Sequence, residues 1–162
     1  MADQVARAIF DCNVYLQAAA NEEGPAGKAF SLFEREEILL FISDEVFEEV
    51  KDVMNRPRIR AAFPGLSDLS VAAFLKRLET KAILIKNIPE EFALERDPDD
   101  AKYVNLAIVT NAGFLVSKDN DLLDLMTAQS AEAQKFRTHY PFLRIMKAAD
   151  FVREVEAAKE NG

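Results

Sequence analysis

Five short apolar runs place the strongest constraint on what this chain can fold into. They are Ala8 to Phe10, Ile38 to Ile42, Ala82 to Ile85, Phe114 to Val116 and Phe142 to Met146. Most of them are continuous rather than alternating in polarity, which is typical of strands in a sheet covered on both faces. Each run is far shorter than the ~20 apolar residues that a membrane-spanning helix needs. We therefore expect a buried, parallel sheet of five strands.

Segments with helical spacing separate these runs. The expected helices are Gly27 to Glu36, Asp44 to Asn55, Ser67 to Lys81, Asp99 to Asn111, Asp119 to Met126 and Ala148 to Lys159. Breaks are expected at Asn21 to Pro25, Arg56 to Gly65 and Asn87 to Pro98. Strands that alternate with helices indicate a parallel sheet wrapped on both sides by right-handed crossovers. The sequence thus predicts an α/β fold in one domain spanning residues 1–162, since this length suits a single buried core.

The composition excludes several kinds of chemistry. Cys12 is the only cysteine and His139 the only histidine, so the chain cannot form an internal disulfide or a zinc site rich in nitrogen and sulfur. A reducing, cytoplasmic location fits this composition and an N-terminus without a signal-type segment. The net charge of −8 argues against binding nucleic acid by general phosphate neutralisation. Two features weaken that objection: cations cancel the charge of a carboxylate site, and basic residues gather between Lys51 and Arg60.

Acidic residues recur where the expected strands end. Asp11 follows the run that ends at Phe10, and Asp119 and Asp121 follow the run that ends at Val116. In an open parallel sheet, ligands bind beyond the carboxyl ends of the strands. We therefore expect these carboxylates to converge at one edge of the sheet.

Helical spacing selects further acids. Glu49 lies at the edge of an apolar stripe on its helix, whereas Glu48 points away from that stripe. Asp100 heads the apolar stripe of the later helix, while Asp99 faces elsewhere. Asp97, followed by proline, is interpreted as a helix N-cap.

Each of these acids has a simpler explanation as a cap, a favourable charge at a helix N-terminus or a solvated side chain. Taken together, they would repel one another unless a cation lay among them. Carboxylates without histidine or cysteine favour Mg²⁺ or Mn²⁺, which shares phosphate oxygens with a substrate. Such centres hydrolyse phosphodiesters, in some cases with two ions ~3.5 to 4 Å apart.

Four segments, in this order, resemble the acidic motifs of PIN domains. They are Ile9 to Val14 with its Asp-x-Asn sequence, Ser43 to Val50, Asp97 to Asp100 followed by Ala107, and Val116 to Leu123. The resemblance covers about residues 8–151 and implies a PIN-like three-layer α/β/α fold. Three further segments are most similar to the VapC-like toxin branch of prokaryotic toxin–antitoxin modules. They are the Asn55-Arg56-Pro57 stretch, the helical insertion up to Lys81 and the ending from Arg144 to Phe151.

The resemblance implies an endoribonuclease dependent on Mg²⁺ or Mn²⁺, restrained by a cognate antitoxin and assembled as a homodimer. Its catalytic and metal-binding residues would be Asp11, Glu49, Asp100 and Asp119, with Asp121 as a fifth metal ligand. Asn13 and Ser117 would orient these acids through hydrogen bonds. Arg56, Arg58, Arg60 and Lys118 are candidates for RNA binding, although a solvated helix end explains the arginines equally well. Lys118 and Cys12 stand where small residues and threonine are frequent in this branch, and neither change removes a carboxylate.

Two alternatives remain open from the sequence. The first is a PIN-fold module that has lost catalysis and binds a protein partner as a scaffold. The second is a phosphatase in which Asp11 attacks phosphorus, although such enzymes require a carboxylate two residues later, where this chain has Asn13.

Overall fold

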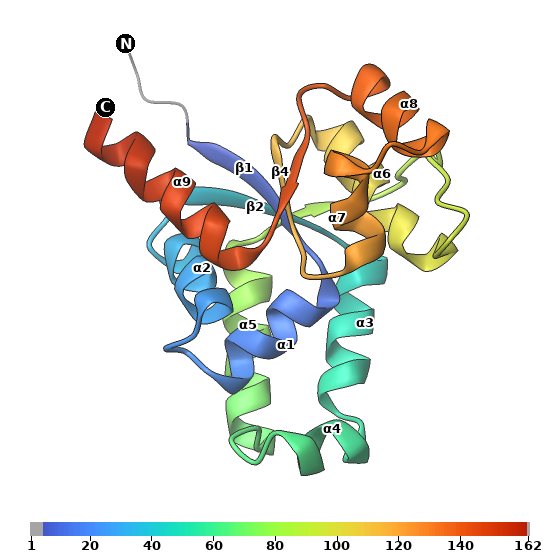
Figure 1. The fold of residues 1–162 in the computed structure, drawn as a ribbon. Coiled ribbons are helices and arrows are strands. Elements are labelled where there is room, and N and C mark those ends of the chain that lie inside the picture. Colours follow the sequence, from blue (N-terminus) through green and yellow to red (C-terminus); the bar gives the residue numbers. More distant parts are fainter. Residues whose placement is uncertain (1–4, 162) are drawn as a thin grey trace.

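The five strands form one all-parallel sheet in the computed structural model, which describes residues 5–161 (Figure 1). The strands are β1 (Ala6–Phe10), β2 (Ile38–Ser43), β3 (Ile83–Ile85), β4 (Phe114–Val116) and β5 (Arg144–Met146). Their order across the sheet is β3-β2-β1-β4-β5. Every apolar run singled out in the sequence overlaps one of these strands, and the prediction of a parallel α/β fold is confirmed.

The register of the central strands determines where the chain can bind a ligand. β1 pairs with β2 on one side and with β4 on the other, and Phe10 at the end of β1 is paired with Val116 at the end of β4. The chain leaves these two strands in opposite lateral directions, because β1 leads to β2 and β4 leads to β5. Parallel sheets bind ligands at such a switch point, beyond the carboxyl ends of the strands.

Helices cover both faces of the sheet. They are α1 (Cys12–Ala20), α2 (Pro25–Glu34), α3 (Asp44–Met54), α4 (Pro57–Ala62), α5 (Asp68–Lys81), the 3-10 helix η1 (Pro98–Asp100), α6 (Ala101–Thr110), α7 (Asn120–Thr127), α8 (Ala131–His139) and α9 (Ala148–Asn161). Helices α1, α2 and α9 pack together on one face, and α6 packs against β1, β2 and β4 on the other (Figure 1). Among residues 5–161, no helix has the length and apolar character needed to cross a membrane.

Three helices were not expected from the sequence. Helix α4 lies inside the predicted break at Arg56 to Gly65, begins at a proline in its first turn and buries no residue. Its six residues therefore give no apolar periodicity to detect. Helices α1 and α8 begin at the caps Asp11 and Ser130. His139, the only histidine, is the last residue of α8.

The buried face of α5 also differs from the prediction. The helix was expected over Ser67 to Lys81 because Leu69, Ala72, Ala73, Leu75 and Leu78 have the spacing of one helix face. In the structure the buried residues are Val71, Phe74 and Leu78, while Leu69 is 84% exposed. Phe74 stacks on Phe30 of α2 with ring centroids 4.4 Å apart, so the aromatic contact selects the face that turns inward.

Candidate metal centre

Asp11 and Ser117 meet where β1 and β4 end. Asp11 is 5% exposed, and one of its carboxylate oxygens caps α1 by accepting a hydrogen bond from the amide of Val14 at 3.0 Å. The hydroxyl of fully buried Ser117 donates a hydrogen bond to the other oxygen. The paired ends of the two strands thus hold the Asp11 carboxylate in one orientation.

Ser117 also orders the loop that carries Asp119. Its hydroxyl oxygen accepts a hydrogen bond from the backbone amide of Asp119 at 2.9 Å. One oxygen of Asp119 in turn accepts from the amide of Asp121 at 2.8 Å, which starts α7. A single serine therefore connects the Asp11 carboxylate to the backbone from which Asp119 projects.

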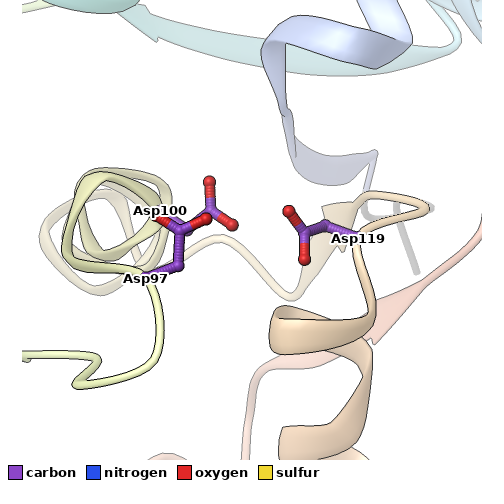
Figure 2. Close-up of side chains that lie close together, drawn as sticks. All are labelled: Asp97, Asp100 and Asp119. Carbon is purple, nitrogen blue, oxygen red and sulfur yellow. The ribbon is translucent and has the colours of Figure 1, made fainter.

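Asp97, Asp100 and Asp119 form a cluster of three carboxylates, shown in Figure 2. One oxygen from each lies within 4.8 Å of the others. Asp97 and Asp100 come from the start and end of η1, and Asp119 faces them from the loop before α7. Within residues 5–161, no other set of three or more acidic, histidine or cysteine side chains converges in this way.

The electrostatics of this cluster suit a cation. Burial, followed by the neighbouring carboxylates of Asp119 and Asp97, raises the pKa of Asp100 to about 8. One oxygen of Asp100 is buried and has no hydrogen-bond partner. Carboxylate donors that repel one another, with one oxygen left unpaired, match the needs of a hard divalent ion such as Mg²⁺ or Mn²⁺. The residues present therefore fit the metal that the sequence implies.

Asp11, which is buried at 5% exposure, has a different environment. Burial raises the pKa of its carboxyl group, while the hydrogen bonds from Ser117 and Val14 lower it and the charge of Asp119 raises it further. Burial, with the charges of Glu49 and Asp11, also raises the pKa of the neighbouring Cys12 thiol to about 12. The thiol is consequently neutral at physiological pH in the metal-free protein.

Glu49 lies in the same pocket but already has two partners. The hydroxyl of Tyr103 donates to one oxygen of Glu49 at 2.5 Å, and the ammonium of Lys102 forms an ion pair with the other. The Tyr103 hydroxyl oxygen also accepts from the backbone amide of Cys12 at 3.1 Å. Glu49 is thus fixed to the backbone that follows β1.

A pocket of about 410 Å³ unites most of the predicted residues. The four predicted catalytic acids line it, namely Asp11, Glu49, Asp100 and Asp119. Three other candidate residues line it as well, namely Asn13, Arg56 and Lys118. The buried side-chain oxygen of Asn13 has no hydrogen-bond partner. The hydrogen bond by which Asn13 was expected to orient the acids is therefore not seen for this oxygen. The orienting hydrogen bonds expected of Ser117 are present.

Three predicted residues have other surroundings. Asp121 forms an ion pair with Arg96 at 2.6 Å. Arg60 donates to the carbonyl of Met54 at 2.6 Å and to the side chains of Asn55 and Asp68, which joins the end of α3 to the start of α5. Arg58 is exposed on α4 and does not line the pocket.

Asp97 is the residue whose interpretation changes most. The sequence assigned it to an N-cap, and it does precede η1, but its side chain makes no capping hydrogen bond. It faces Asp100 and Asp119 instead. The available signal was its spacing of three residues from Asp100, which places two acids on the same side of a helical turn.

Comparison with known proteins agrees with this geometry. The family model of the PIN domain matches residues 7–121, which is more than half of the chain. The chain is also similar to an uncharacterized protein of Methanocaldococcus jannaschii, with 24% identity over 150 residues, covering 93% of this chain and 92% of the other. No solved structure matches it. PIN domains are generally metal-dependent nucleases. With the family model spanning the strands and acids that build the pocket, the chain belongs to the PIN domain family.

Proposed function

We propose that this protein is an endoribonuclease that hydrolyses RNA phosphodiester bonds with Mg²⁺ or Mn²⁺. The observation that carries the proposal is the convergence of Asp97, Asp100 and Asp119 within 4.8 Å, with Asp100 and Asp119 lining the pocket of a PIN domain. A divalent ion bound there would supply a site for activating water and for offsetting the charge of the phosphate.

The chain's own residues would divide the remaining work. Asp100 and Asp119, with Asp97, would hold the ion, and Asp11 would complete the acidic floor of the pocket. Ser117 would keep Asp11 and the Asp119 loop in register through its two hydrogen bonds.

Two cationic side chains are placed to contact the substrate. Arg56 and Lys118 line the pocket, and Arg56 is held by a 2.7 Å ion pair with Asp52, an exposed residue on α3. An RNA phosphate could replace Asp52 as the partner of Arg56 with little loss of free energy, because an exposed ion pair contributes only about 0 to 1 kcal/mol to stability. Local cations of this kind let an acidic protein bind RNA at one place.

The direct test is cleavage of single-stranded RNA with Mn²⁺ or Mg²⁺ and with EDTA. We expect cleavage only with the metal and a rate loss of about 100-fold or more in Asp100→Asn and Asp119→Asn, since removing one electrostatic contact to the transition state commonly costs this much. Asp124→Asn is the matched control, because Asp124, which lies on α7, pairs with Arg96 and does not line the pocket. Equal cleavage in EDTA, or wild-type rates in both pocket variants, would contradict the proposal.

The resemblance to VapC-like proteins leads us to propose that the nuclease is the toxin of a toxin–antitoxin module. Its partner would be a cognate antitoxin, and the active form would be a homodimer. Expression with and without the product of any small reading frame found next to the gene tests this. Growth inhibition by the wild type, relieved by the partner and absent in Asp119→Asn, is expected. Equal growth in all strains would remove the toxin role and leave the nuclease proposal standing.

A further inference from the structure

Lys102 places a positive charge inside the pocket that the acidic motifs build. It is the second residue of α6, and its ammonium pairs with Glu49 of α3. The side chains of Lys102 and Glu49 are only 18% and 30% exposed, respectively. The ammonium also lies 5.4 Å from the centre of the Tyr103 ring, a distance at which a cation is attracted to the ring face. This ion pair is therefore a built feature of the pocket and not a solvated surface contact.

Both oxygens of Glu49 are engaged by this arrangement. Lys102 takes one, and the Tyr103 hydroxyl takes the other while it accepts from the backbone amide of Cys12. For Glu49 to bind a metal ion, at least one of these contacts must break. The Asp100 carboxylate differs, because one of its oxygens is buried without any partner.

We propose that Lys102 is a positioning residue that takes the place of a second metal ion. By neutralising Glu49, it keeps this acid out of the metal ligands, so that the centre binds one divalent ion through Asp97, Asp100 and Asp119. The inference rests on the proposed metal-dependent function, and it specifies the stoichiometry and the ligand set of that site.

Charge balance supports this assignment. A lysine is positively charged at neutral pH, and a dication placed next to Glu49 would lie beside that charge and be repelled. Removing the ammonium would leave the negative charge of Glu49 without a paired cation in the pocket that Asp11 and Asp119 also line. Such a pocket has the excess negative charge that a second dication requires.

The test is the number of Mn²⁺ ions that each chain binds. Calorimetry and the electron paramagnetic resonance signal of the ion measure this number. We expect one Mn²⁺ per chain in the wild type. Lys102→Met, which keeps the length of the side chain and removes its charge, should bind a second Mn²⁺. The double variant Glu49→Gln/Lys102→Met should return to one ion, and Lys102→Arg should stay at one. Thermal unfolding of each metal-free variant verifies that it is folded.

The possible failures are distinct. Two ions in the wild type, or Lys102→Met with the stoichiometry and affinity of the wild type, would overturn the role of Lys102 and leave the nuclease proposal intact. The absence of any Mn²⁺ binding by the wild type, or binding that Asp119→Asn does not weaken, would overturn the metal site itself and this inference with it.

Discussion

The carboxylates on the two walls of the pocket differ in the partners that they contact. On the wall formed by η1 and the loop before α7, Asp100 and Asp119 line the pocket and converge with Asp97, which lies beside it. None of these three acids takes part in an ion pair found within residues 5–161. On the wall formed by α3 and α6, Glu49 has a cation on one oxygen and a phenol on the other. On the first wall, therefore, none of the three carboxylates is paired with a cation, whereas on the second wall the carboxylate of Glu49 already is.

This difference shows that position in a pocket does not by itself make a carboxylate a metal ligand. Four acids from the family motifs line one pocket, yet their partners differ. An acid whose oxygens are already paired must lose those contacts before it binds an ion, whereas an acid among other acids gains by binding one. The following predictions test whether the two walls differ in this way.

The largest expected effect is on stability in the presence of metal. At a free Mn²⁺ concentration about 100 times the dissociation constant, one bound ion raises the free energy of unfolding by about 2.7 kcal/mol. We expect this gain in the wild type and in Glu49→Gln/Lys102→Met, and its loss in Asp119→Asn. Denaturant unfolding with and without Mn²⁺ measures it. If the double variant loses the gain as Asp119→Asn does, the two walls are equivalent and the comparison is wrong.

Ser117→Ala should have the next largest effect, and it needs no metal. The substitution removes the hydroxyl that donates to buried Asp11 and accepts from the amide of Asp119. A buried polar group left without its partner costs about 1 to 3 kcal/mol, and we expect a loss of stability in that range. Urea unfolding of the metal-free protein is the measurement. A change below about 0.5 kcal/mol, the size typical of surface substitutions, would mean that Ser117 does not hold the site together.

Asp97→Asn separates the structural interpretation of this residue from the one based on sequence. As a member of the cluster, Asp97 should contribute to metal affinity, and we expect Mn²⁺ binding to weaken about tenfold, equivalent to about 1.4 kcal/mol. Asp124→Asn is the matched control, because the side chain of Asp124 is 45% exposed, lies outside the cluster and does not line the pocket. It should change the affinity by about threefold or less, since exposed charges are screened by salt. Equal effects in the two variants would return Asp97 to the role of a cap.

The case of Asp97 shows where sequence reasoning about the site stops. Asp11 and Asp119 were identified because each follows a strand, and the pairing of Phe10 with Val116 brings those strand ends together. Asp97 was missed because an acid before a proline at a helix start is explained equally well as a cap. Lys102 and Tyr103 were missed as partners of Glu49 because they are 53 and 54 residues away in the chain, and no local pattern connects them.

The fold was predictable for a related reason. Strands β1, β2 and β4 are continuous apolar runs because both faces of the sheet are covered, and such runs are visible without knowledge of the packing. Helix α4 has no buried residue, so nothing in its sequence distinguishes it from a loop. On α5, a stripe through Leu69 seemed as suitable as the correct one, because only the contact between Phe74 and Phe30 decides which side is buried.

Tyr103→Phe has the smallest expected effect, and it tests the wall formed by α3 and α6 most specifically. It removes only the hydroxyl that connects the amide of Cys12 to Glu49, in a residue that is 3% exposed. We expect a loss of about 1 kcal/mol in metal-free stability, the typical contribution of one hydrogen bond. Because Lys102 would still hold the other oxygen of Glu49, Mn²⁺ stoichiometry should remain at one ion per chain. A second ion bound by this variant would show that the phenol, and not the ammonium, keeps Glu49 from the metal.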